Sequence, residues 1–521
     1  MIRNVEVLVV GAGPTGLTLA LELARRGVPH AVIDLNEAPA TGSRGKGLQP
    51  RSLEVLDDLG VIDEILATST TGQPLRLHQG RELVVELGTA ARARPGVPYP
   101  SLVLLPEWRV EQVLRERLVG FGGKVEYGAG LVSFEQDGEG VVAELGNGET
   151  VGARYLVGCD GGHSTVRRLL GATLEGRTHE DQYFLVGDVT VDGLDSDAAY
   201  AWFGDGGSYL ALSPLPNAEG AWQFQANVLP GPDGSVREPT LETFRLLFRE
   251  RSGRTDVTLR EATWLSRYRF NARMVSDYRH GRVFLAGDAA HVHSPAGGQG
   301  MNTGIQDAYN LGWKLAAVLG GAPDQLLDSY SCERVPVAAK VLADSSRGFE
   351  SVFALRGARR FLRDHVIFPL VRRPAVMSRL LARTDQLGIA YRHSPLTVAS
   401  GPRGGVRPGD RAPDARGTTA DGAPARLFDF TRGPHWTVLG FGAEAARGLA
   451  VLERGEGPGI GVRTCLAVRS GRGDLVGPEA ADLYGARDGT LVLIRPDGHL
   501  ALRTEDPEVV VGYLDRGCAA P

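Results

Sequence analysis

The sequence predicts an α/β protein of several domains, and three observations lead to this prediction. Residues 5–34 combine an apolar strand, a glycine turn, a helix and a second strand, which is a βαβ unit. Residues 180–270 contain segments in which apolar residues recur at every second position, as in an antiparallel sheet. Behind a stretch rich in Gly, Pro and Arg, further apolar segments indicate a separate small α/β domain. At roughly 150 residues per domain, 521 residues correspond to about three domains.

The composition excludes several classes of protein. Apolar residues make up 42% and charged residues 23%, as in ordinary globular chains. Only four of the 57 basic residues are lysines, the net charge is -5, and no basic tract of the kind that tracks nucleic acid occurs. No apolar run reaches the roughly 18 residues of a membrane span. The four cysteines lack zinc or CxxC spacing, and no cleavable leader precedes the first strand. We therefore expect a cytoplasmic protein with neither a nucleic-acid nor a membrane partner.

The elements of the N-terminal half follow from periodicity and turn residues. The first strand runs from Val5 to Val10, and the helix after the glycine turn shows apolar residues at helical spacing until Gly27 ends it. A short second strand ends at Asp34. The pattern further predicts helices at residues 51–66 and 108–119 and a stretch of hairpins at 124–154. The hairpins lead into another glycine turn at residues 158–162.

From about residue 180 onward the pattern alternates between sheet and helix. Strands with period two are expected at residues 183–191 and 221–228, and a buried strand at 281–287. A long helix covers 300–319, and more helix is expected over 329–387. We expect a linker at 400–424 because Gly, Pro and Arg dominate there, followed by strands at 436–441 and 491–494.

The strongest local motif is the glycine turn of the first βαβ unit, which spells GxGxxG. Gly11 permits the tight turn, Gly13 lets a pyrophosphate approach the backbone, and Gly16 allows the helix to pack closely on the strand. The helix N-terminus then offers N–H groups and a positive dipole end to the phosphates. Asp34 ends the second strand, where a carboxylate binds an adenosine ribose. The motif predicts a dinucleotide site that includes Gly11, Gly13, Pro14, Thr15, Gly16 and Asp34.

Two further motifs occur in order along the chain. Residues 160–167 spell DGxxSxxR, and residues 287–291 spell GDAAH ahead of the glycine-rich segment 295–302. With these three motifs, residues 1–390 resemble the FAD-dependent aromatic hydroxylases, the group A flavoprotein monooxygenases related to para-hydroxybenzoate hydroxylase. The C-terminal part is similar to the thioredoxin-like extension of phenol-type and polyketide-type hydroxylases.

The resemblance implies a division of the chain into three domains. A discontinuous FAD-binding, Rossmann-like domain of the GR2 type would comprise residues 1–75, 101–180 and 271–400. A mixed or antiparallel substrate-binding sheet would be inserted at residues 76–100 and 181–270. The thioredoxin-like α/β domain would cover residues 401–521.

The resemblance also implies roles for individual residues. Asp288 would accept hydrogen bonds from the ribityl chain, with a core Asp bonded to backbone N–H groups as the alternative. Arg44 and Arg109 would contact FAD, although Glu107 stands where the family has Gln, and Gln49 would lie near the ribityl chain. Asp160 and Arg167 would bridge the dinucleotide fold, or form a purely structural ion pair. The glycine-rich segment would approach the flavin pyrimidine edge through Pro295, Gly298, Gly300, Met301 and Asn302.

The implied activity is hydroxylation of an aromatic, phenolic or polyketide-type substrate, in antibiotic biosynthesis or modification, with NADPH or NADH and O2. FAD would form a C4a-hydroperoxide, and since the cofactor carries this chemistry no catalytic side chain is named. Baeyer–Villiger oxidation or epoxidation on the same scaffold stays open, as does a redox-inert FAD-binding scaffold protein. A second domain for NAD(P)H is not expected, and the protein would be a monomer or homodimer.

Three other patterns are given structural interpretations. His291 and His293 form HxH, but no third ligand at a sensible spacing follows, so we expect no metal site. A second glycine turn, GxGxxA at residues 440–445, is interpreted as an ordinary βα turn because no clear second strand ending in an acid follows. Aromatic residues of the sheet segments would either line a substrate pocket or form the sheet core, namely Tyr200, Trp202, Phe203, Trp222 and Phe224.

Overall fold

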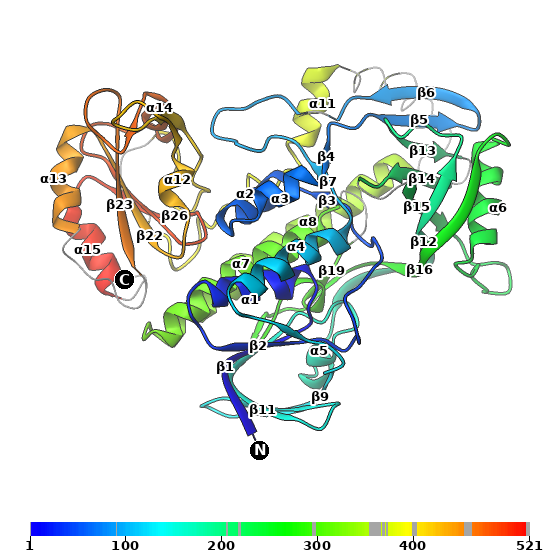
Figure 1. The fold of residues 1–521 in the computed structure, drawn as a ribbon, viewed down its shortest axis with the longest axis horizontal. Coiled ribbons are helices and arrows are strands. Elements are labelled where there is room, and N and C mark those ends of the chain that lie inside the picture. The colour runs from blue at the N-terminus through cyan, green and yellow to red at the C-terminus, as the bar shows by residue number, and fades with distance from the viewer. Residues whose placement is uncertain are drawn as a thin grey trace.

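The structure is a computed structural model, and it describes residues 2–89, 91–204, 207–216, 220–293, 298–353, 366, 370, 373–398, 404–452 and 461–516. Figure 1 shows three sheets side by side, with the C-terminal part of the chain on one side and the longest antiparallel strands on the other. No helix within these ranges is both long and apolar enough to cross a membrane.

The first sheet contains the N-terminal βαβ unit. Its strand order is β17-β18-β11-β1-β2-β8, and β1, β2, β8, β11 and β18 pair in parallel. The strands and their bounds are β1 (Ile2–Val10), β2 (His30–Ile33), β8 (Val125–Glu126), β9 (Leu131–Gln136), β10 (Val141–Leu145), β11 (Thr150–Gly158), β17 (Arg279–His280) and β18 (Val283–Leu285). The carboxyl ends of β1, β11 and β18 meet at one edge, which is where ligands bind in open α/β sheets. All three sequence motifs follow these strands.

Helices cover this sheet and fill the centre of the molecule. They are α1 (Pro14–Ala24), α2 (Pro50–Asp58), α3 (Ile62–Ala67), α4 (Glu107–Gly120), α5 (Thr165–Leu169), α7 (Gly300–Leu319) and α8 (Asp328–Phe353). The single helix expected over residues 51–66 is wrong, because Gly60 adopts a left-handed φ of 71° and separates α2 from α3. The further helix expected within 329–387 is present as α8 and as α11 (Pro374–Leu381), but turns replace it after Leu381. Most of residues 354–372 lie outside the described part.

The second sheet is predominantly antiparallel, in the order β19-β16-β12-β15-β14-β13-β5-β6. Its strands are β5 (Leu75–Gln79), β6 (Glu82–Leu87), β12 (Glu175–Asp192), β13 (Ala199–Phe203), β14 (Tyr209–Pro214), β15 (Ala221–Val228), β16 (Thr258–Met274) and β19 (His291–Val292). A small third sheet joins β3 (Gly47–Leu48), β4 (Thr70–Thr71) and β7 (Val103–Leu104) between the two. The two long strands β12 and β16 run from the first sheet outward (Figure 1).

The two faces of the second sheet have different roles. Helix α6 (Leu241–Ser252) covers one face and buries most of the aromatic residues that the sequence pointed to, Tyr200, Trp202, Trp222 and Phe224. These four therefore form sheet core, and only Phe203 packs on the opposite face. That opposite face carries Phe184, Asp188 and their cross-strand partners, since side chains alternate along a strand.

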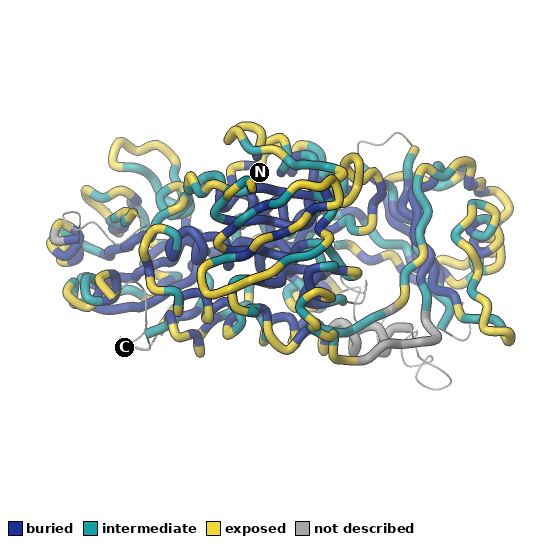
Figure 2. The backbone as a smooth tube through the Cα atoms, turned by 90° about the horizontal axis from the view of Figure 1, so that it is seen from below, coloured by how far each residue is buried: buried dark blue, intermediate teal, exposed yellow. Residues whose placement is uncertain are grey.

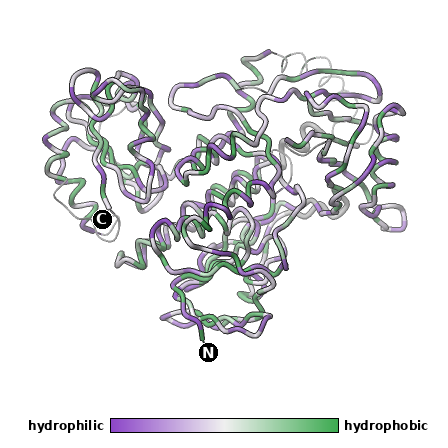
Figure 3. The backbone as a smooth tube through the Cα atoms, in the orientation of Figure 1, coloured by the Kyte–Doolittle hydropathy of each residue, from purple (hydrophilic) through white to green (hydrophobic). Residues whose placement is uncertain are grey.

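The C-terminal residues form a sheet of seven strands in the order β21-β20-β24-β23-β22-β25-β26. These are β20 (Arg416–Thr418), β21 (Pro424–Arg426), β22 (Trp436–Phe441), β23 (Val462–Val468), β24 (Leu475–Val476), β25 (Leu491–Ile494) and β26 (Leu500–Thr504). The helices are α12 (Phe428–Thr431), α13 (Gly442–Leu452), α14 (Glu479–Tyr484) and α15 (Pro507–Asp515). Figure 3 shows hydrophobic segments in the middle of this sheet and more polar ones toward its outside.

The linker expected at 400–424 is wrong for much of its described part. Strand β20 lies inside the range, pairs with β21 and β24, and belongs to the C-terminal sheet. Gly405 and Gly409 adopt positive φ angles of 63° and 88° and lie directly against the backbone of residues 484–485 and 391–392. The glycines of this segment thus permit close packing, which composition alone does not distinguish from flexibility.

The C-terminal sheet is fastened to the central helices by the hairpin turn between β25 and β26. Arg495 donates to both carboxylate oxygens of Glu333 on α8, at 2.6 and 2.9 Å, and also pairs with Asp497. Lys314 of α7 donates to Glu333 at 2.7 Å. Burial alone would raise the pKa of Glu333, but Arg495 and Lys314 hold it below its usual value. Figure 2 shows the buried backbone running without interruption from this region into the centre.

The same turn is tied to α7 and α2 by further bonds. Asp497 accepts from Asn310 at 3.1 Å and from Trp313 at 3.3 Å, and its carbonyl oxygen accepts from Arg51 at 2.7 Å. The indole rings of Trp313 and Trp436 meet edge to face at 5.6 Å. Since the four charged groups are fully or almost fully buried, each one needs its partners.

We expect Arg495→Met to lower the free energy of unfolding by about 3–5 kcal/mol, because it leaves Glu333 and Asp497 buried with Lys314 as their remaining cation. Urea denaturation followed by tryptophan fluorescence measures the change. The matched control is Arg469→Met, which breaks an exposed pair with Asp482 and should cost less than about 1 kcal/mol. Equal losses in the two variants would contradict the structural role of the hairpin turn.

Candidate functional site

The three glycines of the first motif have three different surroundings. A Cβ at Gly11, whose φ is 105°, would overlap the backbone of Cys159 at the end of β11. A Cβ at Gly16 would overlap the carbonyl oxygen of Gly11. Gly13 is open, and the nearest atom to its added Cβ would be Oε1 of Glu111 at 3.9 Å. The first and last glycines thus allow close packing, while the middle one leaves free space beside the N-terminus of α1.

Asp34 closes the turn from the side of β2. Its Oδ2 accepts the N–H of Ala12 at 2.7 Å, and its Oδ1 accepts the N–H of Asn36 at 2.9 Å. Thr15 lies on the other side, where its Oγ1 would be 2.5 Å from a Cβ at Gly287. The first motif and the third are therefore in direct contact through Thr15.

The second motif caps helix α5 and forms hydrogen bonds to the third motif. Asp160 Oδ2 accepts the N–H groups of Thr165 at 2.7 Å and Val166 at 3.2 Å, at the start of α5. Arg167 donates to the carbonyl oxygens of Gly162 at 2.7 Å and Ala289 at 2.9 Å. The structural ion pair considered for Asp160 and Arg167 is wrong, because Arg167 instead ties the second motif to the third.

In the third motif the buried carboxylate is Asp307 of α7, and the sequence did not single it out. It accepts from the N–H of Gly287 at 3.1 Å, from Nε of Arg334 at 2.6 Å, and lies 2.6 Å from Nε2 of His291. Burial alone would raise the pKa of Asp307, but Arg334 and His291 lower it. Asp307 therefore takes the role of core carboxylate that was the alternative for Asp288.

Asp288 itself lies in a 3-10 turn, η2 (Gly287–Ala289), and is exposed. Its carboxylate forms no hydrogen bond or ion pair within the described part of the chain. Desolvation by the surrounding protein nevertheless raises its pKa, while His291 and Arg44 act against that shift. An accessible carboxylate without a protein partner can accept hydrogen bonds from a ligand.

The loop of residues 42–49 lies near Asp288, on whose carboxylate Arg44 acts, and its backbone is bonded on both sides. Glu107 of α4 accepts the N–H of Gly45 at 2.7 Å, so the Glu that replaces the family's Gln keeps an acceptor in place. Asn302 donates to the carbonyl oxygens of Gly47 and Gly298, each at 2.8 Å, and accepts the N–H of Gln49 at 2.8 Å. The side chain of Asn302 thus links the N-terminus of α7 to the loop.

Two guanidinium groups remain available beside this loop. Arg44 is exposed and Arg109 partly exposed, and neither forms an ion pair or side-chain hydrogen bond with another described residue. Arg44 influences the carboxylates of Glu107, Glu111 and Asp288, so it lies close to all three. Positive charge without a protein partner is suited to a diphosphate.

The glycine-rich segment before α7 is described from Gly298 onward, and Pro295 lies outside the described residues. Gly298 adopts a φ of 59° and is exposed. A Cβ at Gly300 would lie 3.8 Å from Asp288 and 3.9 Å from His293, and Met301 approaches Gly45. The first N–H groups of α7 have no partner within the helix, and the helix begins beside Asp288.

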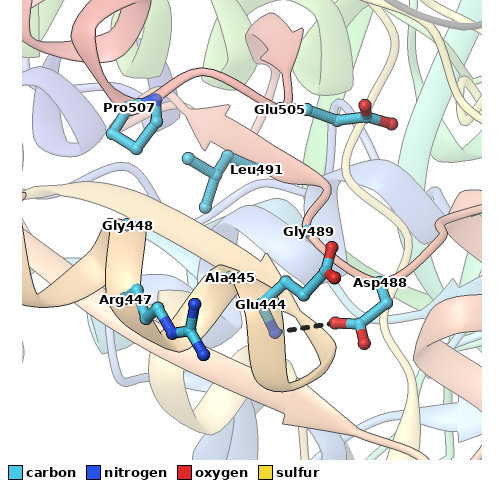
Figure 4. Close-up of a pocket in the computed structure, with 9 residues that line it drawn as sticks. All are labelled: Glu444, Ala445, Arg447, Gly448, Asp488, Gly489, Leu491, Glu505 and Pro507. Atoms are coloured by element: carbon cyan, nitrogen blue, oxygen red, sulfur yellow. Dashed lines mark hydrogen bonds between the residues drawn. The ribbon is translucent and has the colours of Figure 1, made fainter.

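The second glycine turn, at residues 440–445, differs from the first. A parallel strand, β23, follows it but ends at Val468 and not at an acid, in agreement with the sequence interpretation. In addition, the carboxylate of Asp488 accepts the N–H of Glu444 at 2.8 Å and occupies the N-terminus of α13 (Figure 4). Glu444, Asp488 and Glu505 line the adjacent pocket of about 310 Å³. An acidic pocket whose helix end is already capped repels phosphate, so the βα-turn interpretation is retained.

The HxH pair belongs to the core. His291 is fully buried against Asp307, and its ring lies 4.6 Å from that of His293. Within the described ranges, no group of three or more His, Cys, Asp or Glu residues is placed to hold a metal ion.

Residues 4–345 match the family model described as FAD binding domain. The chain is 42% identical over 522 residues to a flavin-dependent monooxygenase of Mycobacteroides abscessus, covering 98% of this chain and 99% of the relative. The chain belongs to the FAD-dependent monooxygenases. It is also 38% identical over 523 residues to the 6-methylpretetramide 4-monooxygenase of Streptomyces rimosus, with 96% and 90% of the two chains covered.

Among solved structures, the aklavinone-11 hydroxylase in complex with FAD and aklavinone superposes with a TM-score of 0.82. The two chains are 27% identical, and the alignment covers 99% of each. The similarity extends over the C-terminal domain as well as the FAD-binding part. The FAD cofactor and the mixed α/β architecture expected from the sequence are thereby confirmed.

The residues present fit FAD. The open side of Gly13 would accommodate a diphosphate, and the unpaired Arg44 and Arg109 would supply its counter-charge. The accessible carboxylate of Asp288 is suited to sugar-chain hydroxyls. Sequence reasoning missed Asp307, Glu111 and the bonding role of Glu107. Asp307 could have been noticed as an acid within the helix predicted at 300–319, whose other residues are largely apolar or small.

We expect Gly13→Ala to weaken FAD binding about ten- to a hundredfold, or roughly 1.4–2.8 kcal/mol, because the methyl group enters the space beside α1. The backbone at Gly13 has a φ of -74°, so alanine fits without strain and the melting temperature of the apoprotein should not change. Gly138→Ala, at another open glycine, is the control. Quenching of FAD fluorescence measures the affinity; equal affinities of the two variants would contradict this position for the diphosphate.

The affinity for FAD should also fall as the pH rises through about 8. Burial raises the pKa of Glu111 to about 8, and Glu107 and Asp34 act in the same direction, while Arg115 and Arg44 oppose them. Below that pH the Glu111 carboxyl group is neutral; above it a negative charge faces the diphosphate at Gly13. Glu111→Gln should remove this pH dependence. An unchanged profile in the variant would show that another group is responsible.

Proposed function

We propose that this FAD-dependent monooxygenase inserts one atom of O2 into an aromatic, phenolic or polyketide-type compound, with NADPH or NADH as the reductant. The observation that carries the proposal is that the accessible carboxylate of Asp288, the N-terminus of α7 and the loop 42–49 lie together, and that the same loop is bonded to the second sheet through Asp188. Relatives support the substrate class: they include pentachlorophenol and anhydrotetracycline monooxygenases, at 33% and 31% identity.

The cofactor contacts that we propose follow from the same geometry. Gly11, Gly13, Pro14, Thr15 and Gly16 would form the cradle for the diphosphate, and Asp34 would bind the adenosine ribose. Arg44 and Arg109 would neutralise the diphosphate, and Asp288 would accept from the ribityl chain. Gln49, Asp160, Pro295, Gly298, Gly300, Met301 and Asn302 would shape the flavin end, with Asn302 acting through the backbone that it orders.

We also propose the three-domain division given by the sequence. The grouping of β5 and β6 with β12–β16 supports an inserted substrate domain at residues 76–100 and 181–270. In the C-terminal sheet, β22-α13-β23 is parallel, and β25, β26 and α15 follow after α14, with β25 antiparallel to β22. This order of elements supports the thioredoxin-like assignment, which stays a prediction.

Bound FAD would supply the electron transfer and the activation of O2, and the protein residues would hold and shield the reactants. The N-terminus of α7, beside Asp288, carries free N–H groups and a positive dipole end, which would stabilise negative charge on a ring bound there. The fixed loop 42–49 would separate the cofactor side from the sheet side. Packing of both sides would exclude water during the reaction.

The test is NADPH and NADH oxidation by the FAD-loaded protein, screened against phenols and hydroxylated polycyclic aromatics, with mass analysis of the products. We expect at least one compound to accelerate the oxidation and to gain one oxygen atom. A protein that binds FAD but consumes NAD(P)H at the same slow rate with every compound would contradict the proposal and favour a redox-inert scaffold.

A further inference from the structure

Three helices begin at the proposed cofactor contacts and meet again away from them. Helix α1 follows the first glycine turn, α2 follows the loop 42–49, and α7 begins beside Asp288. Asp58 is the last residue of α2. Its carboxylate lies 2.6 Å from the guanidinium group of Arg25 at the end of α1 and accepts from the hydroxyl group of Tyr309 on α7 at 2.9 Å. Asp58 thus fixes the three helices relative to one another.

The remaining partner of Asp58 belongs to the C-terminal domain. Its other carboxylate oxygen accepts the N–H of Gly433 at 2.7 Å. The neighbouring Asp57 is only 1% exposed, and it accepts from Arg426 at 2.6 Å and from Arg432 at 2.7 Å. Two adjacent carboxylates at the end of α2 are therefore bound by one short segment of the C-terminal domain, the segment around α12.

The charged residues nearer the start of α2 are bonded in the same way. Arg51 donates to the carbonyl oxygen of Asp497 at 2.7 Å, and Glu54 accepts from Arg411 at 2.8 Å. Every charged side chain of α2 is thus bonded to the C-terminal domain, which lies beside this helix in Figure 1. The apolar side chains of α2 are buried in the central core, but hydrophobic contacts have no direction. Charge-assisted hydrogen bonds have a defined geometry, so they set the orientation of α2.

Helix α2 continues directly from the loop 42–49. Gln49 is both the last residue of the loop and the N-cap residue of α2, and its N–H is bonded to Asn302 of α7 at 2.8 Å. From Gln49 to Asp57 the chain advances eight residues, or roughly 12 Å at about 1.5 Å per residue. A short helix of this kind is a rigid element, so a displacement at its far end moves the loop as well.

We propose that the C-terminal domain positions the FAD cofactor indirectly, with Asp57 and Asp58 as the positioning residues. The segment around α12 holds the far end of α2, and α2 holds the loop 42–49 and, through Asp58, also α1 and α7. The two regions are then coupled, so that bound FAD strengthens the contact between α2 and the C-terminal domain by the same factor. This inference rests on the cofactor contacts proposed above and gives the C-terminal domain a role in them.

The first test replaces the two arginines on the side of the C-terminal domain. We expect Arg426→Met combined with Arg432→Met to raise the Kd for FAD at least about fivefold, at the lower end of the couplings found between linked sites. Quenching of FAD fluorescence measures the Kd at a temperature well below unfolding. The visible spectrum of the bound flavin, which reports the surroundings of the ring, should also shift. Arg426→Lys combined with Arg432→Lys keeps both charges and should restore most of the affinity and the spectrum.

Arg503→Met is the matched control, because Arg503 is buried in the same domain and bonded to its backbone. It donates to the carbonyl oxygens of Tyr484 at 2.8 Å and Gly485 at 2.6 Å. We expect this variant to lower the melting temperature while leaving the FAD affinity and the flavin spectrum unchanged. If it weakens FAD binding as much as the methionine pair does, the general stability of the domain is responsible and the inference is wrong.

The second test needs no variant and follows hydrogen exchange of the full-length protein with and without FAD. We expect FAD to slow the exchange of backbone amides in α2 and in residues 426–433 at least about fivefold, because the coupling is reciprocal. Amides of α15, in the same domain, should exchange at an unchanged rate. Slower exchange that is confined to the first glycine turn and the loop 42–49 would overturn the inference.

These readouts separate the inference from the proposed function, because all of them measure FAD binding and none measures turnover. If the methionine pair binds FAD as tightly as the wild type, the inference is wrong and the monooxygenase function stands. If Arg44→Met leaves the FAD affinity unchanged, the loop does not contact the cofactor, and the proposed contact fails together with the inference. If no aromatic compound is oxygenated, the proposed function fails, while the FAD measurements still decide the inference.

Discussion

The loop of residues 42–49 is the constraint on which the rest of the site depends. Its backbone is bonded to α4 through Glu107, to α7 through Asn302, and to the second sheet through Asp188. A segment fixed from three elements keeps its position whether or not a ligand is bound. Helices α4 and α7 are thus joined to the second sheet through this loop.

A second constraint is the burial of charge in the central helices. Asp307 joins the third motif to α8, and Glu333 joins α7 and α8 to the C-terminal hairpin turn. Helix α7, which begins beside Asp288, is consequently held toward its other end by the turn between β25 and β26. Buried charges confer little net stability, but removing one partner is costly, so the network favours a single arrangement of the domains.

The local structure could be predicted from the sequence where one short segment determines it. The turn at Gly11–Gly16 and the helix at 300–319 follow from glycine spacing and periodicity, and both agree with the structure. Long-range partners could not be predicted this way: Asp188 meets Ser43 across 145 positions, and Arg495 meets Glu333 across 162. The break at Gly60 and the packed segment 404–424 were not predicted, because a glycine in a sequence indicates close backbone packing as readily as it indicates a flexible turn. The composition contained one indication that was not used: the chain has only four lysines, and burial lowers the pKa values of two of them, Lys46 and Lys314.

The central claim is that a flavin held beside this loop transfers oxygen from O2 to a ring held on the sheet. The most direct measurement is the reaction of the FAD-loaded enzyme with NADPH, an accepted phenol and isotopically labelled ¹⁸O2. The account predicts that each product molecule carries one labelled oxygen atom on its ring. Product oxygen that comes from water, or NADPH consumption that yields only hydrogen peroxide, would contradict it.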